Sequence, residues 1–157
     1  PKPQTPNPKP RTTYNYLPCI GNTKSKTKHE NLEKLIMADK HSIIISVESG
    51  AFERNFDTFK NMDPYFIIDI NGQHQKSYPI RGGGKNPTFK QSFSFSATKE
   101  DIIKISVYDL DLTSDDFIGS CEFSVSEGLE AGGYQDVDIY NRSEDFEGTL
   151  KVEVRNE

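Results

Sequence analysis

The hydrophobic pattern of this chain changes near residue 41. From there to the end, apolar residues recur with a period of two, in short runs rich in β-branched and aromatic residues and bounded by turn signals. Such runs are typical of β-strands. The last run is the clearest, because Leu150, Val152 and Val154 alternate with charged residues. The pattern predicts strands near residues 42–49, 64–71, 73–80, 89–96, 102–109, 117–125, 134–140 and 147–155.

The connections between these runs favour an antiparallel arrangement. Asn71-Gly72 separates the second run from the third and predicts a two-residue hairpin, because both turn positions favour positive φ. No crossover helix fits between the later runs. The sequence therefore predicts an all-β fold, an eight-stranded antiparallel β-sandwich over residues 41–157.

The region before residue 41 follows a different pattern. Residues 1–26 contain six of the nine prolines and predict a basic, extended segment or linker with polyproline II character. Over residues 27–40, Thr27 and Glu30 have the spacing of a capping box, and the apolar residues that follow share one helical face. This second stretch predicts one short amphipathic helix.

Charge is divided between the same two regions. The formal net charge is −5; residues 1–40 hold 8 Lys/Arg and 3 Asp/Glu, a balance of +5, and residues 41–157 hold 11 and 21, a balance of −10. The acidic balance of the predicted domain disfavours nucleic-acid binding. The two cysteines, Cys19 and Cys121, are far apart in sequence, which argues against a disulfide framework and suits a reducing, cytoplasmic compartment.

Carboxylates concentrate in connections that are predicted to share one end of the sandwich. When consecutive strands run antiparallel, the connections after the first, third and fifth strands emerge together. Like charges gathered at one rim destabilise a fold unless a cation neutralises them, and oxygen ligands on irregular loops suit Ca²⁺ better than Mg²⁺ or a transition metal. The sequence therefore predicts a calcium site at this rim. Its carboxylates are Asp57, Asp63, Asp109, Asp111, Asp115 and Asp116.

Several stretches are similar to the C2 domain family, and they occur in the family's order. They are Asp57-x5-Asp63 followed by Pro64-Tyr65, Asn86-Pro87-x-Phe89, Val107-Tyr108-Asp109-Leu110-Asp111 and Asp116-Phe117-Ile118-Gly119. The resemblance covers about residues 42–155 and implies a Greek-key sandwich. No strand signal precedes residue 41 and a strand ends the chain, which favours the circularly permuted, type II form.

The resemblance also implies a function and a set of ligands. Family members typically bind Ca²⁺ and then anionic phospholipid, so the implied protein is a non-enzymatic module on the cytoplasmic side of a membrane. The implied ligands are Asp57, Asp63, Asp109, Asp111 and Asp116. Asp115 is an alternative to Asp116, because the third loop is one residue shorter than in the best-known calcium binders. Phe59 and Leu112 stand at predicted loop tips, where we expect them to contact the membrane.

Other interpretations of these residues remain open. Aspartates are also common turn formers, although five at the family's spacing favour ligation. An EF-hand at Asp109-x-Asp111 fails, because Ser114 and Ser120 stand where that loop needs Gly and Glu. Four basic residues are candidates for a phosphoinositide-binding patch, against the alternative of an ordinary solvated surface. They are Lys76, Arg81, Lys85 and Lys90.

A second function, from a different class, also fits the sequence. In it the sandwich is a structural or scaffolding module within a cytoplasmic or cytoskeletal assembly, with calcium and lipid binding minor or absent. The basic strap of residues 1–40 would then dock a protein partner. An enzyme is disfavoured, because the sequence has neither a His-containing triad motif nor a phosphate-cradling loop signature.

Overall fold

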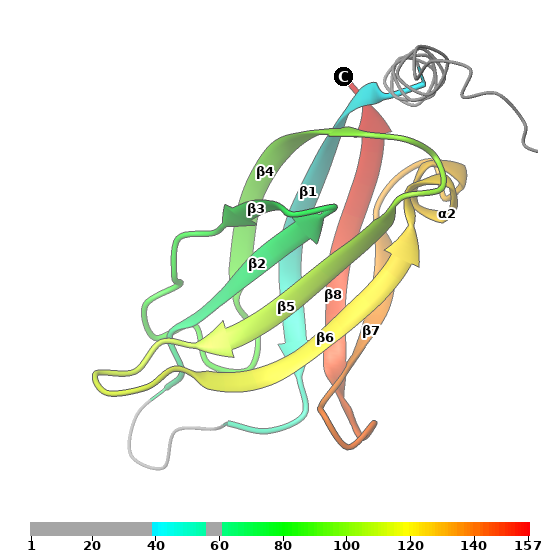
Figure 1. Ribbon diagram of the computed structural model, residues 1–157. Coiled ribbons are helices and arrows are strands. Elements are labelled where there is room, and N and C mark those ends of the chain that lie inside the picture. The colour runs from blue at the N-terminus through cyan, green and yellow to red at the C-terminus, as the bar shows by residue number, and fades with distance from the viewer. Residues whose placement is uncertain (1–38, 56–60) are drawn as a thin grey trace, which may run out of the picture. The chain divides into compact units, whose positions relative to one another are not determined.

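The computed structural model describes residues 39–55 and 61–157. Within them the chain forms antiparallel strands and one short helix, which confirms the predicted all-β fold (Figure 1). In chain order the elements are β1 (His41–Phe52), β2 (Pro64–Ile70), β3 (Gln73–Lys76), β4 (Thr88–Ala97), β5 (Ile102–Asp109), β6 (Asp116–Ser124), α2 (Val125–Glu130), β7 (Gln135–Tyr140) and β8 (Phe146–Asn156).

The predicted extended segment over residues 1–26 lies outside the described residues. So does the helix predicted over residues 27–40, apart from its last two positions. Among the described residues, no helix combines the length and the apolar content needed to cross a bilayer.

The strands form two packed layers. The strand order is β3-β2-β5-β6-β7-β8-β1-β4, and β6 meets β7 through the pairing of Ser120 with Tyr140 alone. The order therefore divides into β3-β2-β5-β6 and β7-β8-β1-β4, which lie one in front of the other in Figure 1. The last strand, β8, pairs with β1 along most of its length, which is the neighbour relation that the permuted type II form requires.

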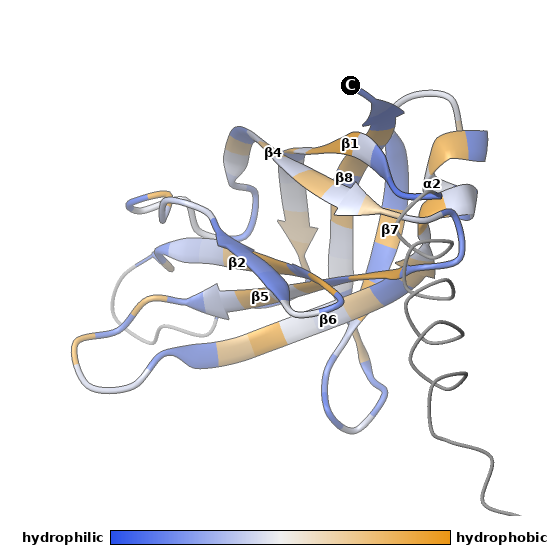
Figure 2. Cartoon of the chain, turned by 45° about the horizontal axis from the view of Figure 1, so that its top comes forward, coloured by the Kyte–Doolittle hydropathy of each residue, from blue (hydrophilic) through white to orange (hydrophobic). Residues whose placement is uncertain are grey.

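The hydrophobic core lies between the two layers, because each strand turns its apolar positions to the inside. The alternation is visible along the strands in Figure 2. Phe66 of β2 is fully buried and makes edge-to-face contacts with Phe89 and Phe93 of β4, at ring-centroid distances of 5.0 and 6.0 Å. Burial of one such side chain stabilises the fold by about 1.5–3 kcal/mol. Cys121 lies in the same core, and burial raises the pKa of its thiol to about 12, so it acts as a small apolar residue.

The helix α2 is the element that the sequence pattern did not predict. Ser124 caps it, because its hydroxyl accepts the Glu127 N–H while the Glu127 carboxylate accepts the Ser124 N–H. Buried Gly128 brings the helix against Val154 of β8. The helix has six residues and directly follows the apolar alternation of β6, so its first turn resembles the continuation of a strand. It joins antiparallel strands, so it is not a crossover.

The connections are distributed between the two ends as antiparallel order requires. We define the loop end by the described connecting residues 53–55, 61–63, 77–87, 110–115 and 141–145, which lie together at the lower side of Figure 1. The β2–β3 hairpin turns at the other end. Its turn residues Asn71 and Gly72 have φ of 51° and 79°, which confirms the predicted turn of two positive-φ residues.

The backbones of β8 and β1 approach each other closely at Gly148. Its φ is 141°, and a Cβ at this position would lie 2.2 Å from the carbonyl oxygen of Ala51 in β1. We expect Gly148→Ala to lower the free energy of unfolding by about 2 kcal/mol or more, because backbone must move to admit the methyl group. Urea denaturation measures the loss. Gly133→Ala is the control, because nothing lies within 4 Å of its Cβ position; equal midpoints for the two variants would contradict this account.

Candidate functional site

Two of the predicted ligand residues, Asp63 and Asp109, meet at the loop end. Asp63 immediately precedes β2 and Asp109 ends β5, and these strands are neighbours whose register pairs Pro64 with Asp109. The Asp63 N–H donates to Asp109 Oδ1 at 2.7 Å, and the Leu110 N–H donates to the Asp63 carbonyl at 3.2 Å. The Asp109 side chain is buried. Sheet pairing thus joins the first and third predicted loops.

The β3–β4 connection reaches the same place. The Asp63 carboxylate accepts the Gly82 N–H at Oδ1, at 2.6 Å, and Nη1 of Arg81 at Oδ2, at 2.9 Å. The side chain of Asp63 is only 14% exposed, whereas that of Arg81 is 72% exposed. A largely covered carboxylate is therefore neutralised by a guanidinium whose other side faces solvent.

Asp115 has a different role from the other candidates. Its Oδ2 accepts the hydroxyl of Tyr65 at 2.7 Å, and its Oδ1 accepts the Asp111 N–H at 3.0 Å. The Tyr65 hydrogen bond is the main cause that holds the pKa of Asp115 below its usual range, followed by the Asp111 N–H and then by the positive charge of Lys76. Burial and the same carboxylate raise the pKa of Tyr65. Asp115 therefore fastens the β5–β6 connection to β2, so the structure gives it a bracing role.

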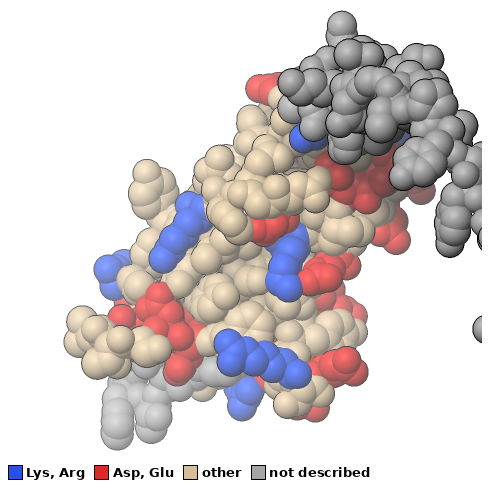
Figure 3. Space-filling view, in the orientation of Figure 1, with Lys and Arg blue, Asp and Glu red and all other residues tan. Residues whose placement is uncertain are grey.

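The remaining predicted residues divide into described and undescribed positions. Asp116 begins β6 and pairs across the sheet with Asp109, and Asp111 is half-buried in the β5–β6 connection. Leu112 is fully exposed. Asp57 and Phe59 lie outside the described residues. Figure 3 shows acidic side chains gathered at the lower left, over the β5–β6 connection, with basic side chains beside them.

This donor set fits Ca²⁺ by its chemistry, because it consists of carboxylate oxygens from two irregular connections. In residues 39–55 and 61–157, however, no group of three or more His, Cys, Asp or Glu side chains is arranged to hold a metal ion. The hydrogen bonds above give a physical reason: the Asp63 and Asp115 carboxylates are directed at donors of the protein itself. An ion bound by Asp63 would have to share or replace those donors.

The four basic residues that the sequence suggested as a patch each contact a different acceptor. Lys76 Nζ lies 3.9 Å from the centre of the Tyr65 ring, and Arg81 bonds Asp63. Lys85 Nζ donates to the carbonyl of Glu53 at 3.3 Å, and Lys90 lies 4.0 Å from the carboxylate of Glu48. Lys76 and Arg81 are therefore part of the acidic site's surroundings, whereas Lys90 belongs to the other layer, at the β1–β4 pairing.

An ion pair between buried Glu147 and solvent-exposed Arg54, which sequence reasoning missed, fixes the start of the β1–β2 connection. Glu147 of β8 is 3% exposed. Its Oε1 accepts Arg54 Nη2 at 2.6 Å and Asn141 Nδ2 at 2.8 Å, and its Oε2 accepts Arg54 Nε at 3.0 Å. Bidentate pairing of this kind is rigid, so Arg54 is held just before the segment that contains Asp57. No signal in the sequence pairs Arg54 with a glutamate so far along the chain.

Comparison with known proteins agrees with this architecture. A family model described as the C2 domain matches residues 41–155. Elicitor-responsive protein 3 of Oryza sativa subsp. japonica is 36% identical over 103 residues, which cover 62% of this chain and 70% of the relative. The 16 kDa phloem protein 1 of Arabidopsis thaliana is 33% identical over 96 residues, covering 56% and 61% of the two chains. The chain belongs to the C2 domain family.

Solved structures share the fold. A C2 domain of plant Extended Synaptotagmin 1 superposes with a TM-score of 0.62 at 18% sequence identity, covering 73% of this chain and 92% of that one. The expected family is thereby confirmed by sequence and the fold by structure.

The Tyr65–Asp115 hydrogen bond can be tested by its pH dependence. Because the pKa of Asp115 is lowered in the folded state, the bond stabilises the fold above the unfolded pKa of about 3.9 and is lost as pH falls through the folded value. We expect Tyr65→Phe to cost about 1–2 kcal/mol at pH 7 and clearly less at pH 3, as measured by urea denaturation. Tyr134→Phe, on a half-exposed ring, is the control. A pH-independent loss in Tyr65→Phe would show that the bond is not the cause.

Proposed function

We propose that this domain is a calcium-dependent binding module that associates with anionic phospholipid and has no catalytic role. The observation that supports this most directly is that strand pairing places Asp63, Asp109 and Asp116 beside one another at the loop end. Asp63 donates its N–H to Asp109, and Asp109 pairs across the sheet with Asp116. With Asp57 and Asp111 these residues make up the ligand set that the family resemblance implies.

The proposed mechanism is an electrostatic switch. The acidic carboxylates of the loop end repel an anionic membrane when they are not neutralised. Bound Ca²⁺ supplies positive charge and open coordination positions for phosphate oxygens. The chain's own contribution is to hold the ligands on fixed strand ends: Asp109 closes β5, Asp116 opens β6, and Asp63 directly precedes β2.

Apolar contact would follow from the same orientation. Leu112 stands in the β5–β6 connection, part of which is orange in Figure 2, and its side chain is fully exposed. A leucine at a loop tip next to neutralised carboxylates is suited to shallow insertion among lipid headgroups. Phe59 is proposed to act in the same way from the first loop. The proposed location is therefore peripheral, at the cytoplasmic side of a membrane.

Vesicle co-sedimentation tests this function. We expect the wild-type chain to pellet with vesicles of phosphatidylcholine and phosphatidylserine in millimolar Ca²⁺, and to remain in solution in EDTA or with phosphatidylcholine alone. The double variant Asp109→Asn/Asp111→Asn should lose most of the calcium-dependent binding, because it removes two charged ligands while keeping oxygen acceptors for the hydrogen bonds. Equal sedimentation of wild type and variant would overturn the proposal.

Matched controls separate ligand loss from general effects of charge or folding. Asp136→Asn/Asp138→Asn removes the same charge from exposed positions of β7 and should bind like the wild type. Thermal melting in EDTA verifies that each variant is folded. In the wild type, Ca²⁺ at a hundred times its Kd should add about 2.7 kcal/mol of stability and raise the Tm.

One observation favours the second candidate, a scaffolding module. The Asp63 carboxylate is already neutralised by Arg81, and that of Asp115 is hydrogen-bonded by Tyr65, so part of the loop end is stabilised by protein donors alone. Such a domain would be able to dock a protein partner without an ion.

The scaffolding candidate makes its own prediction. Affinity purification should recover a stable complex that survives EDTA and is lost when residues 1–40 are deleted, because the basic strap would provide the contact. A complex that dissociates in EDTA, or one that the deletion leaves intact, would count against this candidate.

A further inference from the structure

The carboxylate of Asp63 is already paired with a cationic group of the protein, the guanidinium of Arg81. Both oxygens of its carboxylate are in use: Oδ1 accepts the Gly82 N–H at 2.6 Å, and Oδ2 accepts Arg81 Nη1 at 2.9 Å. The proposed function assigns this same carboxylate to Ca²⁺. Two cations at one carboxylate repel each other, so the ion and the guanidinium compete for Asp63.

The backbone that carries Arg81 is firmly held. The Ile80 N–H donates to the carbonyl of Pro64 at 2.9 Å, and the Gly84 N–H donates to the carbonyl of Met62 at 3.0 Å. Gly82 and Gly84, with φ of 64° and 58°, shape the turn that follows Arg81. Hydrogen bonds on both sides of Arg81 therefore tie this connection to the start of β2, next to Asp63 itself.

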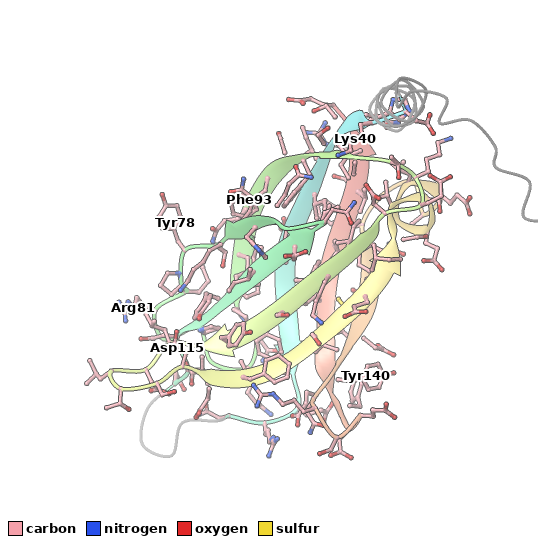
Figure 4. All side chains as sticks on the ribbon, in the orientation of Figure 1. Lys40, Tyr78, Arg81, Phe93, Asp115 and Tyr140 are labelled. Atoms are coloured by element: carbon pink, nitrogen blue, oxygen red, sulfur yellow. The ribbon has the colours of Figure 1, made fainter. Side chains whose placement is uncertain are left out.

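The side chain of Arg81, in contrast, is open to solvent. It is 72% exposed, and Figure 4 shows it at the outer edge of the molecule, pointing outward. A rotation about side-chain bonds is sufficient to move the guanidinium from Asp63 into solvent, because the backbone need not shift. A guanidinium recognises phosphate through the same paired donors that it uses for a carboxylate.

We infer that Arg81 is an internal counter-cation which Ca²⁺ displaces from Asp63, and that the released guanidinium then binds phosphate of the anionic lipid surface. This inference rests on the proposed function and assigns Arg81 two effects. In solution Arg81 lowers the affinity for calcium, because the ion must exchange with it. On a membrane Arg81 raises the affinity of the calcium-loaded domain, because it adds a phosphate contact at the lipid surface.

The variant Arg81→Gln tests both effects in the full chain. Tb³⁺, which replaces Ca²⁺ and luminesces when nearby tyrosines are excited, and isothermal titration with Ca²⁺ report affinity in solution. We expect Arg81→Gln to bind Ca²⁺ about three- to fivefold more tightly than the wild type, the size expected for losing one exposed ion pair. At saturating Ca²⁺ it should bind vesicles containing phosphatidylserine about three- to fivefold more weakly.

Arg142→Gln is the matched control for charge. It removes the same charge from an exposed arginine of the loop end, one whose guanidinium lies 5.3 Å from the Phe117 ring centre. It should change calcium affinity in solution by less than twofold. Melting of both variants in EDTA verifies folding.

A further experiment replaces the vesicles with soluble glycerophosphoserine at equal headgroup concentration. If Arg81→Gln weakens binding of this soluble ester as much as it weakens binding to vesicles, Arg81 binds free phosphate esters and not the lipid surface, which contradicts the inference.

The outcomes separate this inference from the proposed function. If wild type and Arg81→Gln bind Ca²⁺ with equal affinity, the displacement is wrong while the calcium site stands. If Arg81→Gln binds Ca²⁺ more tightly than the wild type, the displacement is supported. The same holds if only the variant binds Ca²⁺ measurably. If neither protein binds Ca²⁺ at millimolar concentration, the flat wild-type titration overturns the calcium site and the displacement together.

Discussion

The face-to-face packing of two antiparallel layers is the constraint on which the loop end depends. Ile45 of β1, Phe66 of β2 and Ile105 of β5 are fully buried between the layers, and burial of many such side chains supplies most of the stabilisation. Because each strand runs back along its neighbour, alternate connections must emerge at the same end. Residues far apart in sequence, such as Asp63 and Asp109, are thereby brought within hydrogen-bond distance.

That placement concentrates negative charge, and the chain neutralises part of it with its own groups. The donors are of three kinds: backbone N–H groups such as that of Gly82, the hydroxyl of Tyr65 and the guanidinium of Arg81. A carboxylate that is close to others and shielded from water needs such donors to remain ionised. The ion binding that we propose at this end would therefore be an exchange of partners, in which protein donors give way to a cation.

The same arrangement divides the site into parts that are braced by hydrogen bonds and parts that are exposed to solvent. The Arg54–Glu147 pair and the Tyr65–Asp115 bond attach the first and third connections to buried strand ends. Arg81 and Leu112 instead project into solvent from the connections that carry them. Connections that are already braced, with side chains exposed on them, are suited to binding a surface, because little conformational entropy is lost when contact forms.

The sequence by itself determined most of the strands, the Asn71-Gly72 turn and the position of the described carboxylates in or directly beside the connections. These are local properties, since alternation and turn preferences act between neighbouring residues. The strand expected over residues 73–80 ends at Lys76. Local pattern also explains why the sequence did not predict α2: its capped turn directly follows the apolar alternation of β6. The partnership of Arg81 with Asp63, the bracing role of Asp115 and the burial of Glu147 were decided by the tertiary structure alone. Each depends on side chains from strands or connections that are distant in sequence, and only packing of the layers sets the distances between them.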